Sequence, residues 1–323
     1  MKIHRLGALL LTGALAMGTA CKSEKANGGS GGKSYTVGVA NFMLSGPYFS
    51  GMDAAIAAQA KAKTAGDVTV KILSTDANGD AAKLAADVED LLSKNVDAVI
   101  ISGGPLESAP AALNAIKAAG KPVVLVDRKF ASGEYTSWIG PDNEAIGRQD
   151  GEFLTNQLSG KGKVAIIKGG PADNSIGLAR TNGLKASLAK SPGVTLVEAP
   201  GFGGWGSDGG LTIMESLLAT HPDVAAVFCE NDAMCLGAQR AIEAAGKSKQ
   251  IVVAGVDGQR EALQAIMAGG NYAVTGLNSA KAIGSMALDR AMQILGGTKV
   301  EKDTVVPSPQ ITKDNAAQYL DPK

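Results

Sequence analysis

The fold is decided by three apolar runs: PVVLVD at residues 122–127, AAVFCEN at 225–231 and IVVAGVD at 251–257. Each run ends on an Asp or Asn and is followed by a segment of helical period. Such runs are typical of buried parallel strands. In open α/β sheets, ligands bind outside the carboxyl ends of the strands. The three terminal residues, Asp127, Asn231 and Asp257, therefore predict a crevice that holds a small polar molecule.

Outward from these runs, strands and helices alternate along most of the chain. Eight short strands are expected at residues 35–40, 68–74, 98–102, 122–127, 163–168, 195–199, 225–229 and 251–256. The first four strands form one series, in which Ala-rich helical stretches begin near Tyr48, Asp80 and Glu107. The second series follows WIGPDN, so the region of Pro141 is the expected crossing between two similar lobes. This pattern predicts an α/β protein with two doubly wound parallel sheets.

Helix starts are marked by side chains that can cap a helix. Asn143, Asp232 and Ser279 each precede a segment of helical period. Their oxygens can accept a hydrogen bond from a backbone N–H in the first turn. We therefore expect helices to be capped at these three positions.

Length and charge limit the class of protein. With 323 residues, of which 45% are apolar, the chain can bury a large core divided between two lobes. Lys plus Arg and Asp plus Glu both number 31, so no field of one sign favours nucleic acid. We expect no nucleic-acid partner.

Residues 1–20 have the pattern of a signal peptide. Lys2 and Arg5 precede an apolar run that is too short to span a membrane, and small residues lead to Cys21. The end resembles a bacterial lipobox, in which the Cys becomes the lipidated first residue, although Gly18 stands where that pattern prefers Leu. Residues 21–34 contain GGSGG and read as a flexible tether. We expect lipidation at Cys21, with ordinary cleavage beside an incidental Cys as the alternative.

The remaining cysteines and histidines give little sign of chemistry. Cys229 and Cys235 are expected as two buried free thiols, because a strand residue and a residue on the next helix need not point at each other. Export leaves a disulfide as the alternative. With only His4 and His221 in the chain, we expect no zinc site, and His221 in the turn THPD is a poor catalytic base. We expect no metal, no cofactor and no catalytic residue.

Aromatic residues number only thirteen, so their positions are informative. Phe42, Tyr48 and Phe49 cluster after the first strand, and Trp205 lies in GFGGWG at residues 201–206. That Gly-rich patch lacks the spacing of a phosphate-binding loop. Rings facing each other across a cleft can enclose the C–H faces of a sugar. For Phe49, an interior ring at the start of a helix is an equal alternative.

Two arginines supply hydrogen-bond donors near the carboxylates. Arg128 directly follows Asp127, and Arg180 lies in NSIGLARTNGL at residues 174–184. A vicinal diol can accept from a guanidinium and donate to a carboxylate. Such charge-assisted bonds contribute about 1.5–3 kcal/mol each. A few of them with ring stacking reach the roughly 8 kcal/mol of a micromolar complex. The alternative for Asp127 and Arg128 is a structural ion pair.

Several stretches resemble the ribose-binding branch of the type I periplasmic solute-binding family. They are GPYF, VVLVDR, WIGPDNEAIGRQDGEFL, HPDVAAVFCENDAMCLGAQRAIEAAGK and VVAGVDG, and the similarity runs from about residue 35 to residue 319. The resemblance implies two Rossmann-like lobes joined by three crossovers. The first lobe would comprise residues 35–141 and 279–306, and the second residues 142–278 and 307–323. It also implies a monomer.

The resemblance assigns the ligand contacts residue by residue. Stacking falls to Tyr48 and Phe49 from one lobe and Trp205 from the other. The positions that match polar contacts are Asp127, Arg128, Arg180, Asn231, Asp257 and Asn278. A further small polar position falls on either Asn41 or Phe42, which the comparison leaves open. Of these, Asp127, Arg128, Trp205, Asn231 and Asp257 also follow from the residues alone.

The departures from the family pattern leave the particular sugar open. Gly46 stands where ribose binders carry Asn, Trp205 where Phe is common, and Asn278 where they carry Gln. Pentoses, hexoses, polyols and furanose-like signals all remain candidates. The implied mechanism is hinge closure on the ligand without chemistry.

The implied partner is a membrane permease of an ATP-driven (ABC) importer. The expected location is the periplasm or cell surface. A sensor that presents sugar to a chemoreceptor or kinase has the same fold and remains an alternative. A LacI-type repressor would need an N-terminal helix-turn-helix in place of the export segment. An enzyme would need a nucleophile–base pair or a phosphate loop.

Overall fold

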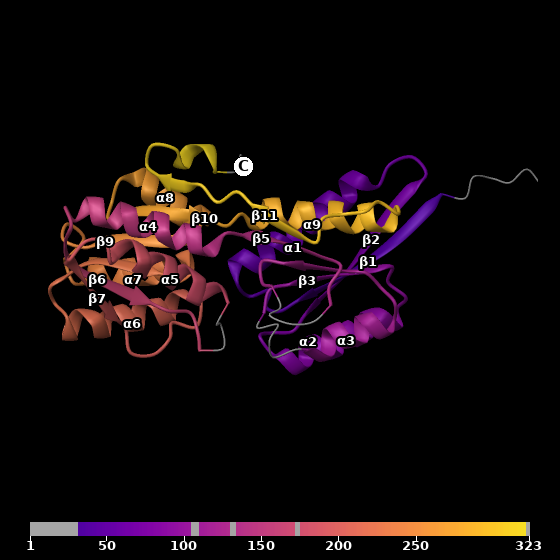
Figure 1. Ribbon diagram of the computed structural model, residues 1–323, viewed down its shortest axis with the longest axis horizontal. Coiled ribbons are helices and arrows are strands. Elements are labelled where there is room, and N and C mark those ends of the chain that lie inside the picture. The colour runs from indigo at the N-terminus through magenta and orange to yellow at the C-terminus, as the bar shows by residue number, and fades with distance from the viewer. Residues whose placement is uncertain (1–31, 105–109, 130–133, 172–174, 321–323) are drawn as a thin grey trace, which may run out of the picture.

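The computed structural model describes residues 32–104, 110–129, 134–171 and 175–320. The expected signal peptide, the lipidation site Cys21, most of the tether and the helix start near Glu107 lie outside these ranges. The described chain forms two lobes, each with a six-stranded sheet and helices on both faces (Figure 1). The predicted α/β fold with two doubly wound lobes is confirmed.

The first sheet has the strand order β11-β5-β4-β3-β1-β2. Its strands are β1 (Lys33–Asn41), β2 (Val68–Asp76), β3 (Ala98–Ser102), β4 (Val123–Val126), β5 (Ser137–Pro141) and β11 (Asp303–Val306). All of its pairings are parallel. Helices α1 (Pro47–Lys63) and α9 (Ala280–Leu295) cover one face, and α2 (Ala81–Ser93) and α3 (Pro110–Ala118) cover the other.

The second sheet has the order β12-β10-β9-β8-β6-β7. Its strands are β6 (Lys161–Ile167), β7 (Gly193–Glu198), β8 (Val224–Cys229), β9 (Val252–Asp257), β10 (Tyr272–Leu277) and β12 (Gln310–Thr312). Only β12, paired with β10, runs antiparallel among the described strands of this sheet. One face is covered by α4 (Asn143–Gln157) and α5 (Ile176–Leu188). The other is covered by α6 (Ser207–Thr220), α7 (Asp232–Ala244), α8 (Arg260–Ala268) and η2 (Ala316–Gln318).

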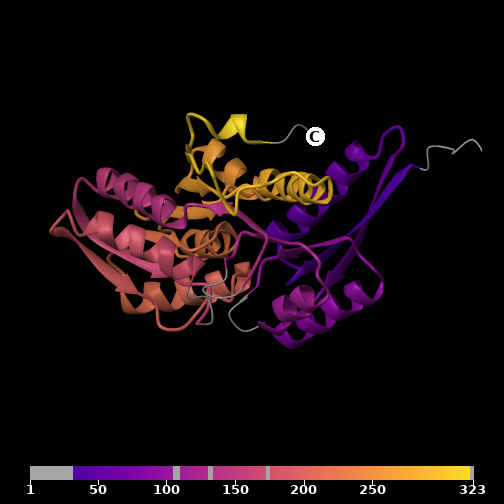
Figure 2. The ribbon, with the colours of Figure 1, turned by 45° about the vertical axis from the view of Figure 1, so that its right-hand side comes forward.

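The chain passes between the lobes at three places in the described ranges: from β5 to α4, from β10 to α9 and from β11 to β12. As a result α9, late in the chain, packs beside α1 in the first lobe, as both Figure 1 and Figure 2 show. The crossings leave from one edge of each sheet, the edge formed by β5 and β11 in the first and by β10 and β12 in the second. We call this edge the hinge edge.

Local sequence explains where the elements begin and end. The eight strands expected from the sequence are confirmed, with their ends shifted by a few residues. Ser279 caps α9, because its side chain accepts from the backbone N–H of Ala282 at 3.1 Å. The other two cap predictions are wrong by one residue. Asp142 caps α4 and Asn231 caps α7, so the expected caps Asn143 and Asp232 are the first residues of their helices.

None of the helices in the described ranges combines the length and hydropathy that a membrane span requires.

Candidate functional site in the cleft between the lobes

A cavity of about 260 Å³ lies where the carboxyl ends of the two sheets face each other. Both lobes contribute to its walls. Ten of the residues expected from the sequence line it: Phe42, Tyr48, Phe49, Asp127, Arg128, Arg180, Trp205, Asn231, Asp257 and Asn278. Its volume is slightly below the roughly 300–1,000 Å³ of pockets for drug-sized ligands, which suits one small molecule.

Asn41 does not reach the cavity. It is 0% exposed, and its Nδ2 donates to Oδ1 of Asp53 at 2.8 Å. Oγ of Ser74 donates to the same carboxylate oxygen at 2.8 Å, so Asn41 belongs to a hydrogen-bonded group behind the end of β1. The reason is strand alternation, which turns consecutive side chains to opposite faces. Of the two residues left open by the sequence, only Phe42 lines the cleft.

Three of the lining residues have an unusual backbone conformation. The φ angles of Asp127, Trp205 and Asp257 are +65°, +62° and +123°. Positive φ is uncommon for residues other than glycine and costs free energy, most of all for a bulky side chain. Asp127 follows the last residue of β4 and Asp257 ends β9. The backbone therefore turns sharply at the strand ends, which directs these side chains into the cleft.

Two carboxylates from different lobes meet through one amide. Nδ2 of Asn278 donates to Oδ1 of Asp127 at 3.0 Å and to Oδ1 of Asp257 at 3.4 Å. The hydroxyl of Tyr48 lies 2.9 Å from Oδ1 of Asn278 and 3.1 Å from Oδ1 of Asp127. Asn278 directly follows β10, at the crossing to α9. The acidic groups of both lobes are thus tied together at the hinge.

Burial dominates the titration of these groups. Burial raises the pKa of Asp127, and the guanidinium groups of Arg180 and Arg128 partly offset the rise. The pKa of Asp257 lies well above its ordinary value for the same reason, with Arg180 again opposing it. Burial also raises the pKa of Tyr48 well above 10.0. These carboxyl groups are buried before a ligand enters, so the free-energy cost of removing them from water does not have to be met on binding. A ligand group that hydrogen-bonds to them therefore binds favourably.

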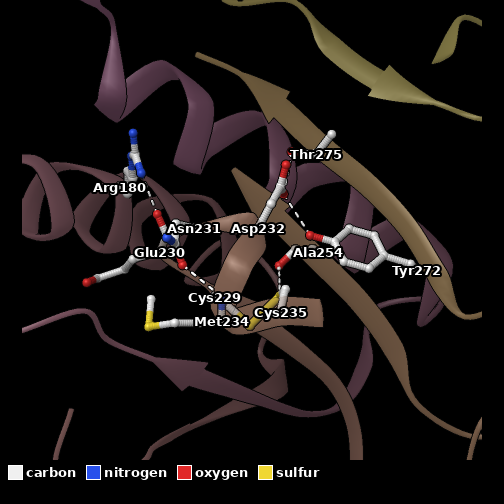
Figure 3. Close-up of a disulfide and its surroundings, with 10 residues drawn as sticks. All are labelled: Arg180, Cys229, Glu230, Asn231, Asp232, Met234, Cys235, Ala254, Tyr272 and Thr275. Atoms are coloured by element: carbon white, nitrogen blue, oxygen red, sulfur yellow. Dashed lines mark hydrogen bonds between the residues drawn. A yellow bond between two sulfur atoms is a disulfide. The ribbon is translucent and has the colours of Figure 1, made fainter. Parts of the chain in front are cut away.

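Arg180 is held on three sides. It is 2% exposed, and its Nε donates to Oδ1 of Asn143 at 2.8 Å. Its Nη1 donates to the carbonyl oxygen of Glu230 (Figure 3), and its Nη2 lies 3.4 Å from Oδ1 of Asp257. The carboxylate of Glu230 accepts from the backbone N–H of Gly169 and from Oγ1 of Thr181, both at 2.7 Å. The charge is therefore fixed in place at the floor of the cleft.

The cleft also contains aromatic groups from both lobes. The ring of Trp205 packs so closely on Gly169 that an added Cβ there would lie 2.1 Å from it. Cζ of Arg128, from the first lobe, lies 5.6 Å from the centroid of the Trp205 ring. In the first lobe, Tyr48 and Phe49 form an edge-to-face pair with centroids 5.4 Å apart. The arrangement provides apolar faces beside the fixed charges.

Asn231 has a structural role as well as a place in the cavity wall. Its Oδ1 accepts from the backbone N–H of Met234 at 3.0 Å, which caps α7, and its Nδ2 donates to the carbonyl oxygen of Trp205 at 3.1 Å. The Asn231 side chain therefore links the start of α7 to the loop that carries the indole.

Cys229 and Cys235 form a disulfide, so the prediction of two free thiols is wrong (Figure 3). The turn from β8 into α7 is tight, since α7 begins only three residues after Cys229. The first turn of the helix folds back over the strand end and brings the two Cα atoms to 5.4 Å, within the range of disulfides. The bond closes a short loop that contains the cap residue Asn231.

A second group of buried polar side chains lies behind the cleft in the second lobe. Oδ1 of Asp232 accepts from the hydroxyls of Tyr272 at 2.7 Å and Thr275 at 2.8 Å (Figure 3), and its Oδ2 accepts from the backbone N–H of Gln259 at 2.8 Å. Burial raises the pKa of Asp232 to about 6, against the effect of these bonds. Within the described ranges, no group of His, Cys, Asp or Glu could hold a metal ion.

Sequence reasoning missed several residues of the site. Met43, Ile176 and Gln259 line the cavity, and Glu230 supports Arg180 from behind. Nε2 of Gln259 is buried without a hydrogen-bond partner among the described residues. The signal for Gln259 was present, since it lies two residues after the strand-end residue Asp257. Met43 and Ile176 carry no such signal, because an apolar residue in a loop has no sequence pattern of its own.

Comparisons with known proteins agree with this architecture. A family model described as a periplasmic binding protein domain matches residues 37–299. The chain is 32% identical over 304 residues to the ribose import binding protein of Bacillus subtilis (strain 168), a match that covers 93% of this chain and 96% of that protein.

Solved structures give the same result. An ABC transporter solute binding protein from Mycobacterium smegmatis with bound glycerol matches with a TM-score of 0.83 and 29% identity, covering 90% of this chain and 98% of that one. One from Bacillus halodurans C-125 with bound myo-inositol matches with a TM-score of 0.82 and 29% identity, covering 91% and 99%. These similarities extend over both lobes.

Proposed function

The chain belongs to the periplasmic binding protein family, and we propose that it captures one monosaccharide or small polyol in the cleft and delivers it to an ABC importer. Members of this family bind solutes outside the cytoplasm and are not enzymes. The observation that carries the proposal is the convergence of Asp127 and Asp257, from different lobes, on one cavity that also contains Arg180. Carboxylates that accept and guanidinium groups that donate match the hydroxyls of a polyol.

Closure of the hinge follows from this division of the contacts. A ligand that touches both lobes binds the closed form more tightly than the open form, because only the closed form offers both sets of contacts. The free energy of that difference shifts the protein toward the closed form. The closed form is then the signal that the permease reads. Binding and closure are one event, and no covalent step is involved.

Lipidation of Cys21 would place this event at a membrane surface. We infer the anchor from the apolar run and the small residues that precede Cys21, together with the Gly/Ser-rich segment that follows. A tether of this composition leaves the two lobes free to turn toward a permease. Metabolic labelling with palmitate should mark the wild-type protein and not the Cys21→Ala variant. An unlabelled wild-type protein would contradict the anchor and leave sugar capture unaffected.

The proposal is tested by thermal unfolding in the presence of pentoses, hexoses and polyols. A ligand at one hundred times its dissociation constant should raise the free energy of unfolding by about 2.7 kcal/mol. Asp257→Ala should remove this stabilisation, because it deletes the second lobe's acceptor for the ligand. Asp208→Ala is the matched control, since the side chain of Asp208 is fully exposed on α6. If no sugar or polyol stabilises the wild-type protein, the proposed function is wrong.

A further inference from the structure

Polar groups are distributed unevenly along the cleft, and the strand order of the second sheet shows how. From the hinge edge inward, the polar lining residues are Asn278 directly after β10, Asp257 as the last residue of β9, and Asn231 two residues after β8. The next strand, β6, is followed by Lys168, which pairs with Glu198 and does not line the cavity, and then by Gly169, Gly170 and Pro171, of which Gly170 and Pro171 line it. The part of the cavity wall that this sheet forms is therefore polar near the hinge edge, whereas Gly170 and Pro171 beside β6 bring no polar side chain to it.

The first sheet repeats this distribution. Strand β4 is followed by Asp127 and Arg128, whereas β3, the next strand inward, is followed by Gly103 and Gly104. Strand β1, farther still from the hinge edge, is followed by Phe42 and then Met43. Asp127 and Asp257, from the two sheets, meet through Asn278 beside the hinge edge. Phe42, Met43 and Pro171 line the cavity beside β1 and β6, which are strands farther from that edge.

Aromatic rings fill the space above Gly103 and Gly104, which follow β3. A Cβ at Gly103 would lie 2.1 Å from the ring of Phe49, and one at Gly104 would lie 2.7 Å from that of Phe42. Beside them, Sδ of Met43 lies 3.9 Å from the position of a Cβ at Gly79. The rings and the thioether thus form a closely packed wall on the first-lobe side.

The second lobe completes this end of the cavity with Pro171 and Ile176. Ile176 lies one turn before Arg180 on α5, so the two side chains share one face of the helix and are about 6 Å apart along its axis. We call Phe42, Met43, Pro171 and Ile176 the apolar end. None of these four side chains can donate or accept a conventional hydrogen bond.

We propose that the preferred ligand is a deoxy monosaccharide whose hydroxyls face the hinge and whose methyl group lies against the apolar end. This inference rests on the proposed function and specifies its substrate class. A hydroxymethyl group placed there would lose its hydrogen bonds to water and gain none from the four side chains. A methyl group loses nothing and is attracted by the same surface. Discrimination by an apolar pocket of this kind is on the order of tenfold to a hundredfold.

Matched sets of sugars test the contribution of the methyl group alone. D-fucose, D-galactose and L-arabinose share the configuration of the ring hydroxyls and differ in having a methyl, a hydroxymethyl or no substituent at one carbon. L-rhamnose, L-mannose and L-lyxose form a second such set, and L-fucose, L-galactose and D-arabinose a third. The experiment measures dissociation constants for all nine sugars by calorimetry with the full-length mature protein.

The expected result is the same order within whichever set binds. The methyl sugar should bind about tenfold more tightly than the hydroxymethyl sugar. It should bind about fourfold more tightly than the unsubstituted pentose, which corresponds to one buried carbon at about 0.8 kcal/mol. Tighter binding of the hydroxymethyl sugar would overturn the inference while leaving sugar capture intact. If none of the nine sugars and no polyol binds, both the inference and the proposed function are wrong.

A substitution at the apolar end tests the assignment of the wall. Met43→Gln keeps the length of the side chain and supplies an amide that can hydrogen-bond a hydroxyl. It should reduce the preference for the methyl sugar at least fivefold. The control is Met267→Gln, the same change at a side chain that is 40% exposed on α8. An unchanged preference in Met43→Gln, with binding retained, would overturn the assignment.

Discussion

The two lobes present different surfaces to the same cleft. The second lobe offers Arg180 held on three sides and Asn231 bonded at both ends of its amide. The first lobe offers Asp127 and Arg128 beside a wall of rings. Ordered polar groups bind a ligand at a lower entropic cost than groups that must first be ordered. We infer that the fixed positions of Arg180 and Asn231 lower the entropic cost of the ligand contacts that the second lobe makes.

The difference extends below the surface of the cleft. In the second lobe, buried acidic residues accumulate near the site: Asp150, Asp232 and Asp257 all have a raised pKa because of burial. In the first lobe Asp127 is the buried carboxylate at the cleft. Buried charges cost free energy even when they are paired. The second lobe therefore carries most of the energetic cost of having the site in place.

The largest expected effect is a difference in stability between variants of the two cleft arginines. Arg180→Met leaves the raised-pKa carboxylate of Asp257 without its nearby cation and should lower the free energy of unfolding by about 3–5 kcal/mol. Arg128→Met removes the contact with the Trp205 ring and the smaller of the two cationic effects on the pKa of Asp127, while Arg180 remains, so it should cost less, about 1 kcal/mol. Urea unfolding of the ligand-free variants measures both values. Both substitutions should weaken sugar binding at least tenfold.

Equal losses of unfolding free energy in Arg180→Met and Arg128→Met would contradict the difference between the two lobes. Arg180→Lys is the informative control, because it keeps the charge and removes the planar fork of donors. We expect it to recover part of the stability and little of the affinity. Full recovery of both would mean that charge alone, without the geometry of the guanidinium group, explains the role of Arg180.

The sequence predicts the polar residues of the site better than its apolar residues. Strand-end residues such as Asp127 and Asp257 are readable, since a polar side chain after an apolar run indicates the edge where ligands bind. The eight strands follow from the same periodicity. Met43 and Ile176 could not be found in this way. Their place in the cleft depends on how loops pack against the other lobe, which no local pattern encodes.

The errors at Cys229 and at the helix caps share a physical cause. Each depends on how sharply the chain turns from a strand into a helix. A shift of one residue moves the cap of α7 from Asp232 to Asn231. The same tight turn brings the two cysteines within bonding distance. Helix ends are uncertain by one or two residues even when the helix itself is clear. Predictions that rest on those ends are accordingly less reliable than predictions of the elements.

The second prediction concerns the disulfide, which only the second lobe has among the described residues. The Cys229→Ala, Cys235→Ala double variant should lose about 2 kcal/mol of unfolding free energy, as expected for a short closed loop. A reductant should lower the stability of the wild-type protein and leave the double variant unchanged. Thiol titration of the denatured, unreduced protein should detect at most one reactive thiol. Two or more reactive thiols would contradict the bond.

The third prediction concerns Asp150, on the buried face of α4. Its two carboxylate oxygens have no hydrogen-bond partner in the described part of the chain, and Gln310 only partly offsets the effect of burial on its pKa. An isosteric amide cannot ionise, so Asp150→Asn should raise the free energy of unfolding at pH 8 by about 1–3 kcal/mol. At pH 4 the two proteins should be nearly equal, because the native carboxyl is then protonated.

The sign of this pH dependence follows from proton binding. Where a carboxyl has a higher pKa in the folded than in the unfolded protein, the folded state binds more protons, so stability falls as pH rises. For Asp232 this window runs from its ordinary value of 3.8 to about 6. Glu198, paired with Lys185 and Lys168, acts in the opposite direction below pH 4.5, because its pKa is lowered to about 2. Urea midpoints at pH 4, 6 and 8 should show a smaller decline in Asp150→Asn than in the wild type; an equal decline would contradict the role of Asp150.

The smallest effect should distinguish two tyrosines, one in each lobe. The hydroxyl of Tyr272, a residue that is 1% exposed, donates to Asp232 at 2.7 Å, so Tyr272→Phe should cost about 1–2 kcal/mol. The hydroxyl of Tyr48 has a single proton for Asp127 and Asn278, at longer distances of 3.1 and 2.9 Å, and Tyr48→Phe should cost about 0.5–1 kcal/mol. Sugar affinity should respond in the reverse order, because Tyr48 lines the cleft and Tyr272 lies behind it. If Tyr272→Phe weakened binding more than Tyr48→Phe, the buried group of the second lobe would position the ligand contacts themselves, and its role would extend beyond stabilising the lobe.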